Sequence, residues 1–404
     1  MDKILVLDFG SQYSHLICRR IREFSVFAEL VPYDISYEEI QKHNPKGIIF
    51  SGGPSSVYNS EAPVPENKIF DMDLPLLGIC YGHQLIVEKF GGKVKRANKE
   101  YGSSILTIDN DSDLLNGVGE SVRAWMSHGD EAEEIPSGFK IIGHTEGAKA
   151  AAIASNEKSV YGIQFHPEVV HTEQGTQILK NFVLKVCGAK QDWTMKGFID
   201  TAVEKISKIE GNVLCGVSGG IDSTVVALLI DKAIGNRMKC VFVDNGLLRL
   251  NEEKEVEEMF KENFKVNFTA VNAGEQFLEK LKGVADPEAK RKIVGEEFIH
   301  VFTKFAEKEG PFKWLAQGTL YPDVIESGVS KGPAAMIKSH HNVGGLPDWL
   351  NLEILEPLRE LYKDEVREIA KILGVPEKLF MRHPFPGPGS VSYTHLTLPT
   401  IYSV

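Results

Sequence analysis

The stretch Ser218–Thr224 constrains the fold of this chain more than any other, because it joins three kinds of local structure. It follows the short apolar run Val213–Val217 and opens into the apolar run Val225–Ile230. This order predicts a buried strand, a glycine-rich turn and the start of a helix. Gly219 and Gly220 allow backbone angles at which successive N–H groups converge on an anion. The pattern predicts either a phosphate site or a capped turn that needs glycine for its geometry alone.

The side chains of this loop stand where the helix begins, a position that offers unpaired N–H donors and a partial positive charge. The candidate phosphate-binding residues are Ser218, Gly219, Gly220, Ile221, Asp222, Ser223 and Thr224. The lysine of the GxxxxGK[ST] phosphate loop is absent, which disfavours ordinary phosphoryl transfer from this motif.

Two further strand ends are predicted at the same edge of a sheet. Asp244 follows the apolar run Lys239–Val243, and Gly318 lies at the end of the predicted strand Trp314–Thr319. Adjacent strand ends of this kind frame a nucleotide pocket in doubly wound sheets, so both residues are candidates for nucleotide contacts, Asp244 for the ribose or the base. For Asp244, a simple Asp-Asn-Gly turn explains the sequence equally well.

The composition limits what the chain can be. Its 404 residues suggest two to three domains, at roughly 100–200 residues each. The net charge of −11 gives no reason to expect nucleic-acid binding. The five scattered cysteines contain no CxxC pair, which favours reduced thiols in a cytoplasmic protein over disulfides or a zinc site. We expect no membrane span, because no apolar stretch is long enough.

The first half of the chain alternates short apolar runs with helical patterns. Ile4–Leu7, Ile48–Phe50 and Leu76–Ile79 are predicted strands, each followed by polar or helical sequence. Such alternation is typical of βαβ units around a largely parallel sheet. The fold class expected for the whole chain is therefore α/β, with two doubly wound domains whose sites lie at the carboxyl ends of the strands.

Cys80 stands in the sequence Gly78-Ile79-Cys80-Tyr81-Gly82, with a glycine two residues away on each side. This spacing matches the logic of the GxSxG elbow, in which a sharp turn exposes a nucleophile before a helix. A helix N-terminus stabilises a thiolate, so Cys80 is a candidate nucleophile. The alternative is a small buried cysteine packed between two glycines.

A base for Cys80 is expected at His166. The predicted strand Val160–Phe165 ends in His166-Pro167-Glu168, and alternation along a strand would place His166 and Glu168 on one face. Glu168 would then orient the imidazole. His83, three residues after Cys80, is the competing base. The other histidines lack the strand-end carboxylate partner proposed for His166 and are expected to be structural: His43, His128, His144 and His171.

Backbone N–H groups at Gly53 and Tyr81 are candidates for an oxyanion hole, because a glycine turn and the residue after a nucleophile both can point donors inward. The motif GxCxGHQ, the later HPE and the earlier SGGP together resemble the class I glutamine amidotransferase family over about the first 187 residues. The resemblance implies glutamine hydrolysis through a glutamyl thioester on Cys80, with Gln84 helping to hold the substrate.

The Ser218 loop resembles the pyrophosphate-binding loop of the N-type ATP pyrophosphatases. With QGTLYPD, KSHHNVGGL, EPLRELYKDEVR and RHPFPGPG following it, the chain resembles the glutamine-hydrolysing GMP synthase family through Gly389. This resemblance implies a carbon–nitrogen ligase in which ATP adenylates the O2 of XMP and ammonia displaces AMP. It also implies Mg²⁺ with ATP, a tentative metal contact at Asp222, and no tightly bound organic cofactor.

Two more residues are candidates in the second half. Lys338 stands beside a glycine-rich loop and is expected to contact an anion, whereas the adjacent His340 and His341 lack a third metal ligand at a recognised spacing. Arg291 matches the family stretch that reaches XMP; otherwise it belongs to an exposed charged helix.

The expected domains are an amidotransferase domain at 1–188, a linker at 189–195 and an ATP pyrophosphatase domain at 196–389. Residues 390–404 carry no charge and depart from the family's pattern, so we expect an aberrant tail in place of a C-terminal dimerisation domain. The homodimer that the family implies, and XMP binding, would then be impaired.

Two other functions remain open from the sequence. One is an ATP-using amidotransferase with a different acceptor, and the other is a non-catalytic protein that retains these folds.

Overall fold

The computed structural model describes residues 1–155, 157–328 and 352–380 of the chain. These residues form two compact units, which meet in the sequence between Thr194 and Met195. Each unit has a β-sheet of its own, and within the described residues no strand of one sheet pairs with the other.

The strands of the first unit are β1 (Lys3–Asp8), β2 (Phe27–Pro32), β3 (Gly47–Phe50), β4 (Leu76–Ile79), β5 (Lys93–Ile108), β6 (Ser121–Glu134), β7 (Lys140–His144), β8 (Ala152–Ser155) and β9 (Val160–Ile163). Over the described residues they form one mixed sheet in the order β2-β1-β3-β4-β9-β8-β7-β5-β6. The pairs from β2 to β9 in this order are parallel, and the pairs from β9 to β6 are antiparallel. The carboxyl ends of the parallel strands therefore lie at one edge, as a doubly wound sheet requires.

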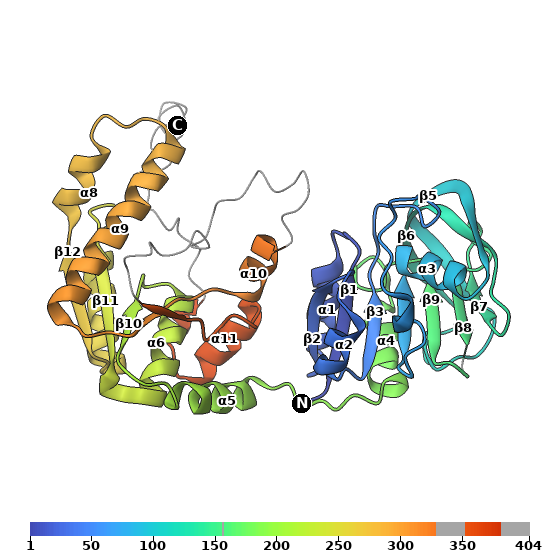
Figure 1. Ribbon diagram of the computed structural model, residues 1–404, viewed down its shortest axis with the longest axis horizontal. Coiled ribbons are helices and arrows are strands. Elements are labelled where there is room, and N and C mark those ends of the chain that lie inside the picture. Colours follow the sequence, from blue (N-terminus) through green and yellow to red (C-terminus); the bar gives the residue numbers. More distant parts are fainter. Residues whose placement is uncertain (156, 329–351, 381–404) are drawn as a thin grey trace. The chain divides into compact units, whose positions relative to one another are not determined.

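The helices of this unit are α1 (Ser14–Arg22), α2 (Tyr37–His43), α3 (Tyr81–Lys89) and α4 (Gly175–Lys180), with the 3₁₀ turn η1 (Asn67–Ile69) and the π-helical turn η2 (Asn181–Val186) continuing α4. Leu5 and Leu7 of β1 share one core cluster with Leu85 of α3. Strand alternation directs Ile4 and Val6 to the other face, where α1 packs against β1 and α4 (Figure 1).

Residues 189–193, which the sequence predicts as a linker, pack against the first unit. The Trp193 ring lies 4.7 Å from the Phe27 ring, and the Arg22 guanidinium lies over both. Trp193 is only 6% exposed, and its N–H donates to Ser25 O. This segment is therefore held by side-chain packing as well as by the backbone.

The strands of the second unit are β10 (Val213–Gly216), β11 (Met238–Asp244), β12 (Phe268–Asn272), β13 (Trp314–Ala316) and β14 (Glu353–Leu355). Over the described residues they form a parallel sheet in the order β12-β11-β10-β13-β14. The strand order changes direction between β10 and β13. In open parallel sheets, ligands bind at such a switch point, outside the carboxyl ends of the strands.

The helices of this unit are α5 (Met195–Ser207), α6 (Ile221–Ile234), α7 (Glu252–Glu258), α8 (Gly274–Leu281), α9 (Pro287–Glu309), α10 (Tyr321–Gly328), α11 (Lys363–Ile372) and α12 (Glu377–Phe380), with the turns η3 (Gly235–Arg237) and η4 (Met259–Phe264). Phe277 of α8 and Phe305 of α9 share a core with Leu214 and Val241 of the sheet. Helices α5, α6 and α11 pack together on the other side of the sheet (Figure 1).

The α/β prediction is confirmed for both units, and the predicted strands at Ile4–Leu7, Ile48–Phe50 and Leu76–Ile79 correspond to β1, β3 and β4. Three predicted strands end earlier than expected: the one through Val217 ends at Gly216, the one through Thr319 ends at Ala316, and the third matters most for the site. The strand predicted through Phe165 stops at Ile163. Glu168 is thus not placed beside His166 by strand alternation.

Candidate active site

Cys80 occupies a sharp turn between β4 and α3. Its backbone angles are φ 52° and ψ −103°, an uncommon conformation for a residue with a Cβ atom. The turn is possible because a Cβ at Gly78 would lie 2.3 Å from Gly82 O, and one at Gly82 would lie 2.5 Å from Phe50 O. Both glycines allow backbone segments to approach more closely than any side chain permits. This is the elbow geometry that the glycine spacing predicts.

Cys80 and His166 converge on Gly52, at the carboxyl end of β3. A Cβ built on Gly52 would lie 3.2 Å from His166 Cε1 and 3.7 Å from Cys80 Cβ. The Cys80 thiol donates to Ser127 O at 3.5 Å and accepts from Gln164 Nε2 at 3.6 Å, and Cys80 is one of the groups that raise the pKa of His166. The nucleophile candidate therefore lies among a base, a carbonyl and an amide.

Glu168 orients His166, although by a turn rather than by a strand. The His166 Nδ1 lies 2.8 Å from Glu168 Oε1, and both side chains are buried. Burial lowers the pKa of His166, but the Glu168 carboxylate and the hydrogen bonds to Cys80 and Glu168 more than offset this and raise it to about 10. Glu168 Oε2 is buried without a hydrogen-bond partner in the described residues.

The competing base, His83, has the opposite environment. Its ring lies against Gly162 of β9, where a Cβ would stand 2.3 Å from Nδ1. Complete burial, together with the charge of His128, lowers the pKa of His83 to about 3, so its imidazole is neutral near pH 7. No hydrogen bond joins it to Cys80 in the described part of the chain. The geometry favours His166 as the base.

Three of the histidines expected to be structural do have carboxylate partners, contrary to what the sequence predicts. His43 pairs with Glu29 at 3.1 Å, His128 with Glu100 at 3.0 Å, and His144 with Asp109 at 2.8 Å. Each carboxylate comes from another element, so no local pattern reveals it. His171 stacks against Trp125, with ring centroids 4.6 Å apart.

Of the two oxyanion-hole candidates, Tyr81 follows Cys80 in the chain, and Gly53 follows Gly52, whose Cβ would lie 3.7 Å from Cys80 Cβ. Neither N–H has a protein acceptor among the described residues, in contrast to Gly82 N, which donates to Ser51 O at 3.2 Å. Gly52, which sequence reasoning passed over within the same SGGP motif, lies closest to the thiol and imidazole. Donors in these positions would stabilise negative charge on a carbonyl oxygen beside Cys80.

Gln84, the proposed glutamine contact, is 3% exposed. Its amide nitrogen donates to Asp130 O at 3.0 Å and to Gln164 Oε1 at 3.3 Å. Gln164 thus connects Gln84 to Cys80 and was missed by the sequence reasoning. Its position two residues before His166 is the signal that could have identified it.

The environment of three other cysteines favours the neutral thiol. Burial raises the pKa of Cys18 to about 12 and also raises that of Cys187. Hydrogen bonding to Cys215 and burial raise the pKa of Cys240. All five cysteines are free thiols. Among the cysteines, Cys80 is the one that lies beside a candidate base, His166.

The Ser218 loop lies at the switch point of the second sheet. Gly219 has φ +73° and packs against Val256, so this position favours glycine. The Ser223 hydroxyl donates to Gly220 O at 3.1 Å and accepts from Ser218 N, while Thr224 Oγ1 donates to the same carbonyl at 2.9 Å. The loop is thus folded by its own hydroxyl groups.

Asp222 is bound by Lys363, a lysine that the sequence analysis did not single out. Lys363 Nζ, at the start of α11, lies 2.6 and 2.5 Å from the two Asp222 carboxylate oxygens. Gly318 lies beside them, since a Cβ there would be 3.3 Å from Asp222 Cβ. The structure therefore brings Gly318 to the loop, as predicted, and adds Lys363 to the set.

For the remaining candidates of the second unit, the structure shows local contacts and no contact with the Ser218–Thr224 loop among the interactions described. Asp244 accepts from Gly246 N at 2.9 Å, which is the turn interaction. Arg291 lies on α9, paired with Glu288, and its Nε is buried without a partner among the described residues. Lys338 and residues 390–404 lie outside the described residues.

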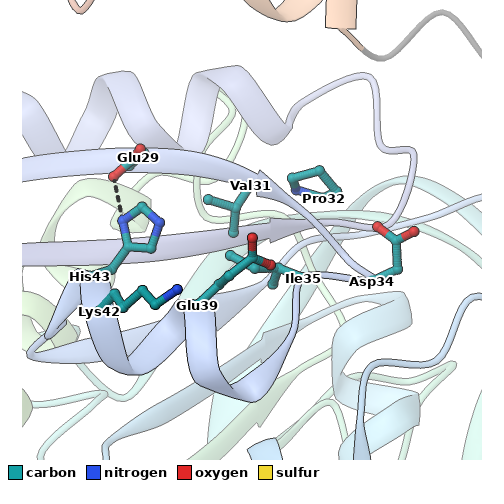
Figure 2. Close-up of a pocket in the computed structure, with 8 residues that line it drawn as sticks. All are labelled: Glu29, Val31, Pro32, Asp34, Ile35, Glu39, Lys42 and His43. Atoms are coloured by element: carbon teal, nitrogen blue, oxygen red, sulfur yellow. Dashed lines mark ion pairs between the residues drawn. The ribbon is translucent and has the colours of Figure 1, made fainter.

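A cavity of about 500 Å³ lies elsewhere in the first unit, beside β2 and α2 (Figure 2). It is lined by Glu29, Val31, Pro32, Asp34, Ile35, Glu39, Lys42 and His43. None of these residues is a predicted site residue. Over the described part of the chain there is no group of three or more His, Cys, Asp or Glu side chains suited to a metal, and no helix long and apolar enough to cross a membrane.

Comparison with known proteins identifies relatives along nearly the whole chain. Residues 5–186 match the family model of class I glutamine amidotransferases, and residues 193–297 match that of NAD synthase. The GMP synthase [glutamine-hydrolyzing] of Clostridium novyi is 54% identical over 391 residues, which are 96% of this chain and 76% of the relative. The protein of the same name from Caldicellulosiruptor saccharolyticus is 55% identical over 390 residues, with the same coverage. Among solved structures, a glutamine amidotransferase from Thermotoga maritima matches with a TM-score of 0.38 at 16% identity, over 46% of this chain and 98% of that one.

Proposed function

The chain belongs to the glutamine-hydrolysing GMP synthase family, and we propose from this that it aminates XMP to GMP with ammonia taken from glutamine, at the expense of ATP. The observation that carries the proposal is the convergence of Cys80 and the Glu168-bound His166 on Gly52. A nucleophile with an oriented base suits acyl transfer from a carboxamide.

In the first unit, His166 holds the proton that Cys80 has given up, and the Cys80 thiolate attacks the carboxamide carbon of glutamine. A C–S bond forms, the C–N bond breaks, and His166 returns the proton to the leaving ammonia. Water then hydrolyses the glutamyl thioester. The N–H groups of Gly53 and Tyr81 would hold the oxyanion, and Gln84 would help to hold the substrate.

In the second unit, the Ser218–Thr224 loop would hold the phosphates of ATP, with Gly318 and Asp244 at the neighbouring strand ends and Lys338 as an anion contact. The O2 of XMP attacks the α-phosphate and pyrophosphate leaves, so the oxygen becomes part of an AMP leaving group. Ammonia then displaces AMP and GMP is formed. Arg291 is the proposed XMP contact. An α-phosphate reaction explains why the loop works without the lysine of a GxxxxGK[ST] motif.

Mg²⁺ is expected to accompany ATP. Asp222 is the one carboxylate of the loop, and it already pairs with the cationic side chain of Lys363. Mg²⁺ in nucleotide sites takes one or two carboxylates and otherwise phosphate oxygens and water, so a single Asp suffices. When bound, it would neutralise charge on the leaving pyrophosphate.

A homodimer and a cytoplasmic location remain predictions. The five free thiols support a reducing compartment.

The test uses the purified 404-residue chain with XMP, ATP and Mg²⁺, and either glutamine or ammonium chloride as nitrogen donor. We expect GMP, AMP and pyrophosphate in equal amounts with both donors. Cys80→Ala should abolish the reaction with glutamine and leave that with ammonium. AMP release that does not depend on XMP, or glutamine use that survives Cys80→Ala, would contradict the proposal.

A further inference from the structure

The long hairpin of β5 and β6 is interrupted beside the candidate active site. Its register runs without a break from Thr107↔Ser121 to Glu100↔His128, and the next pair is Arg96↔Asp130. Three residues of β5 thus stand opposite the single residue Gly129. Such bulges remove ladder hydrogen bonds and re-aim side chains, often next to active sites. Asp130 is therefore held less firmly by the sheet than Ser127.

A side-chain pair spans the bulge where the backbone ladder is broken. His128 Nε2 lies 3.0 Å from Glu100 Oε2 on the partner strand, and His128 Nδ1 lies 3.0 Å from Asp130 O. The His128 side chain is 1% exposed, and Glu100 also accepts from Ser104 Oγ at 2.5 Å. The imidazole therefore connects the regular part of the ladder to the carbonyl beyond the bulge.

The hydrogen bonds define what each atom must do. A carbonyl only accepts, so His128 Nδ1 donates to Asp130 O. Its Nε2 then either donates to a Glu100 carboxylate or accepts from a protonated carboxyl, and in both arrangements one proton lies between them. An amide at position 100 could donate to Nε2 in the same way, whereas alanine could not.

The Asp130 carbonyl connects this pair to the substrate side of the site. It accepts from Gln84 Nε2 at 3.0 Å as well as from His128. The Asp130 carboxylate is held separately, by Ser56 Oγ at 2.5 Å and Tyr58 OH at 2.8 Å. By contrast, the base is held from the unbroken ladder, since His166 N donates to Trp125 O. The pair thus supports Gln84 without touching the Cys80–His166 contact.

We infer that Glu100 and His128 are positioning residues of the glutaminase site: they fix the Asp130 carbonyl across the β5–β6 bulge, and through it the Gln84 amide that holds glutamine. The inference rests on the proposed function, because Gln84 serves glutamine only if the first unit hydrolyses it. Loss of the pair lowers glutamine affinity and leaves the reactivity of the nucleophile unchanged.

The test compares Glu100→Ala with Glu100→Gln in the full chain, supplied with XMP, ATP and Mg²⁺. A lost hydrogen bond to a buried group predicts a KM for glutamine raised about tenfold in Glu100→Ala, with kcat changed by less than about twofold. Glu100→Gln should restore KM to within about threefold of wild type. Alkylation of Cys80 by iodoacetamide should proceed at the wild-type rate in both variants.

The matched control is Glu29→Ala. Glu29 pairs with His43 at 3.1 Å beside the cavity of Figure 2. Its strand, β2, lies at the opposite end of the sheet from β5 and β6. The substitution therefore removes the same kind of ion pair, a histidine with a glutamate, far from the site. It should leave KM, kcat and alkylation unchanged. A rise in KM equal to that of Glu100→Ala would show a general loss of stability and overturn the inference.

The outcomes separate the two proposals. If the wild-type chain hydrolyses glutamine and Glu100→Ala has a wild-type KM, the positioning role is refuted while the proposed function stands. A fall in kcat and in the alkylation rate, without a rise in KM, would also refute it, because the pair would then act on the nucleophile. If the wild-type chain hydrolyses no glutamine although iodoacetamide labels Cys80, the proposed function fails and this inference fails with it.

Discussion

His166 and His83 have opposite charge states near pH 7, although both are buried in the first unit. The Glu168 carboxylate and Cys80 raise the pKa of His166 to about 10, whereas burial lowers that of His83 to about 3. Because both imidazoles are buried, the difference between their pKa values comes from the carboxylate partner that His166 has and His83 lacks. Of the two candidate bases, only His166 can hold the proton that Cys80 gives up.

The raised pKa of His166 predicts how stability depends on pH. Between its ordinary value of 6.5 and about 10, folded His166 keeps a proton that the unfolded chain releases. The free energy of unfolding of the first unit should thus be fully supported below pH 6.5 and fall through this window, by up to about 1.4 kcal/mol per pH unit. Urea unfolding across this range should show a smaller slope in Glu168→Gln. Equal slopes in the wild type and in Glu168→Gln would mean that Glu168 does not keep the proton on His166.

Lys363 offers a prediction for the second unit. It neutralises Asp222 beside the phosphate-binding loop, so Lys363→Met should leave that carboxylate to repel the phosphates of ATP. We expect kcat/KM for ATP to fall about 10- to 100-fold, as for other lost charged hydrogen bonds, with glutamine hydrolysis at Cys80 retained. Arg367→Met, on the exposed face of the same helix, is the control. Unchanged ATP use in Lys363→Met would exclude this role.

Single residues were predictable from the sequence where the chemistry is local. The glycines around Cys80 predict the turn, and the spacing of His166 and Glu168 predicts their pairing, each from a few neighbouring residues. Gln164 and Lys363 were missed because their partners, Cys80 and Asp222, lie 84 and 141 residues away. Such contacts arise only when the sheets bring distant strand ends together.

At the scale of elements, the β4–α3 elbow depends on close approach of backbone atoms. A Cβ at Gly78 would lie 2.3 Å from Gly82 O and 2.6 Å from His83 N, and neither atom can move without changing the turn. Gly78→Ala should therefore destabilise the first unit by about 1–3 kcal/mol and slow the alkylation of Cys80. Chemical unfolding and iodoacetamide labelling measure the two effects.

Gly295, in the middle of α9, is the control for this substitution. It is exposed and a Cβ there meets nothing within 4 Å, so Gly295→Ala should stabilise the second unit by about 0.5–1 kcal/mol through the unfolded chain. Similar destabilisation by both substitutions would show that glycine geometry at the elbow is not the cause.

Elements were predictable where a short apolar run leads into a turn that contains glycine, as after β4 and β10. The end of β9 was not, because Gln164 and Phe165 continue the apolar alternation although the strand stops at Ile163. Here the tertiary position of Cys80 overrides the local pattern: Cys80 N donates to Ile163 O, and the chain then turns toward the site.

At the scale of the whole molecule, the contacts described for the Cys80 site lie within the first unit. The partners of Cys80, His166 and Gln84 described above all lie before Thr194, and Trp193 packs on Phe27 and Arg22. A fragment of residues 1–194 should thus unfold in one transition and react with iodoacetamide at Cys80. A fragment ending at 188, the predicted domain boundary, should be less stable by about 2–3 kcal/mol, because it loses the buried Trp193 side chain. Equal stability of the two fragments would contradict this reading of residues 189–193.

Sequence patterns predicted the two α/β units and the order of their parts. They did not predict the antiparallel half of the first sheet, because β5 and β6 carry no chemical motif and β5 shows no regular alternation of polar and apolar residues. That half supplies Ser127 and Asp130 to the site, so these residues of the glutaminase site could not be identified from the sequence.

The positive φ of Cys80 has a consequence for engineering. Glycine would adopt those angles without strain, so the position where the unit does its chemistry is also one where losing the side chain relaxes the backbone. Selection for thermal stability alone would therefore favour replacements of Cys80 that abolish activity. A search for hardier variants of this chain should therefore score turnover in every round, with residue 80 kept out of the library.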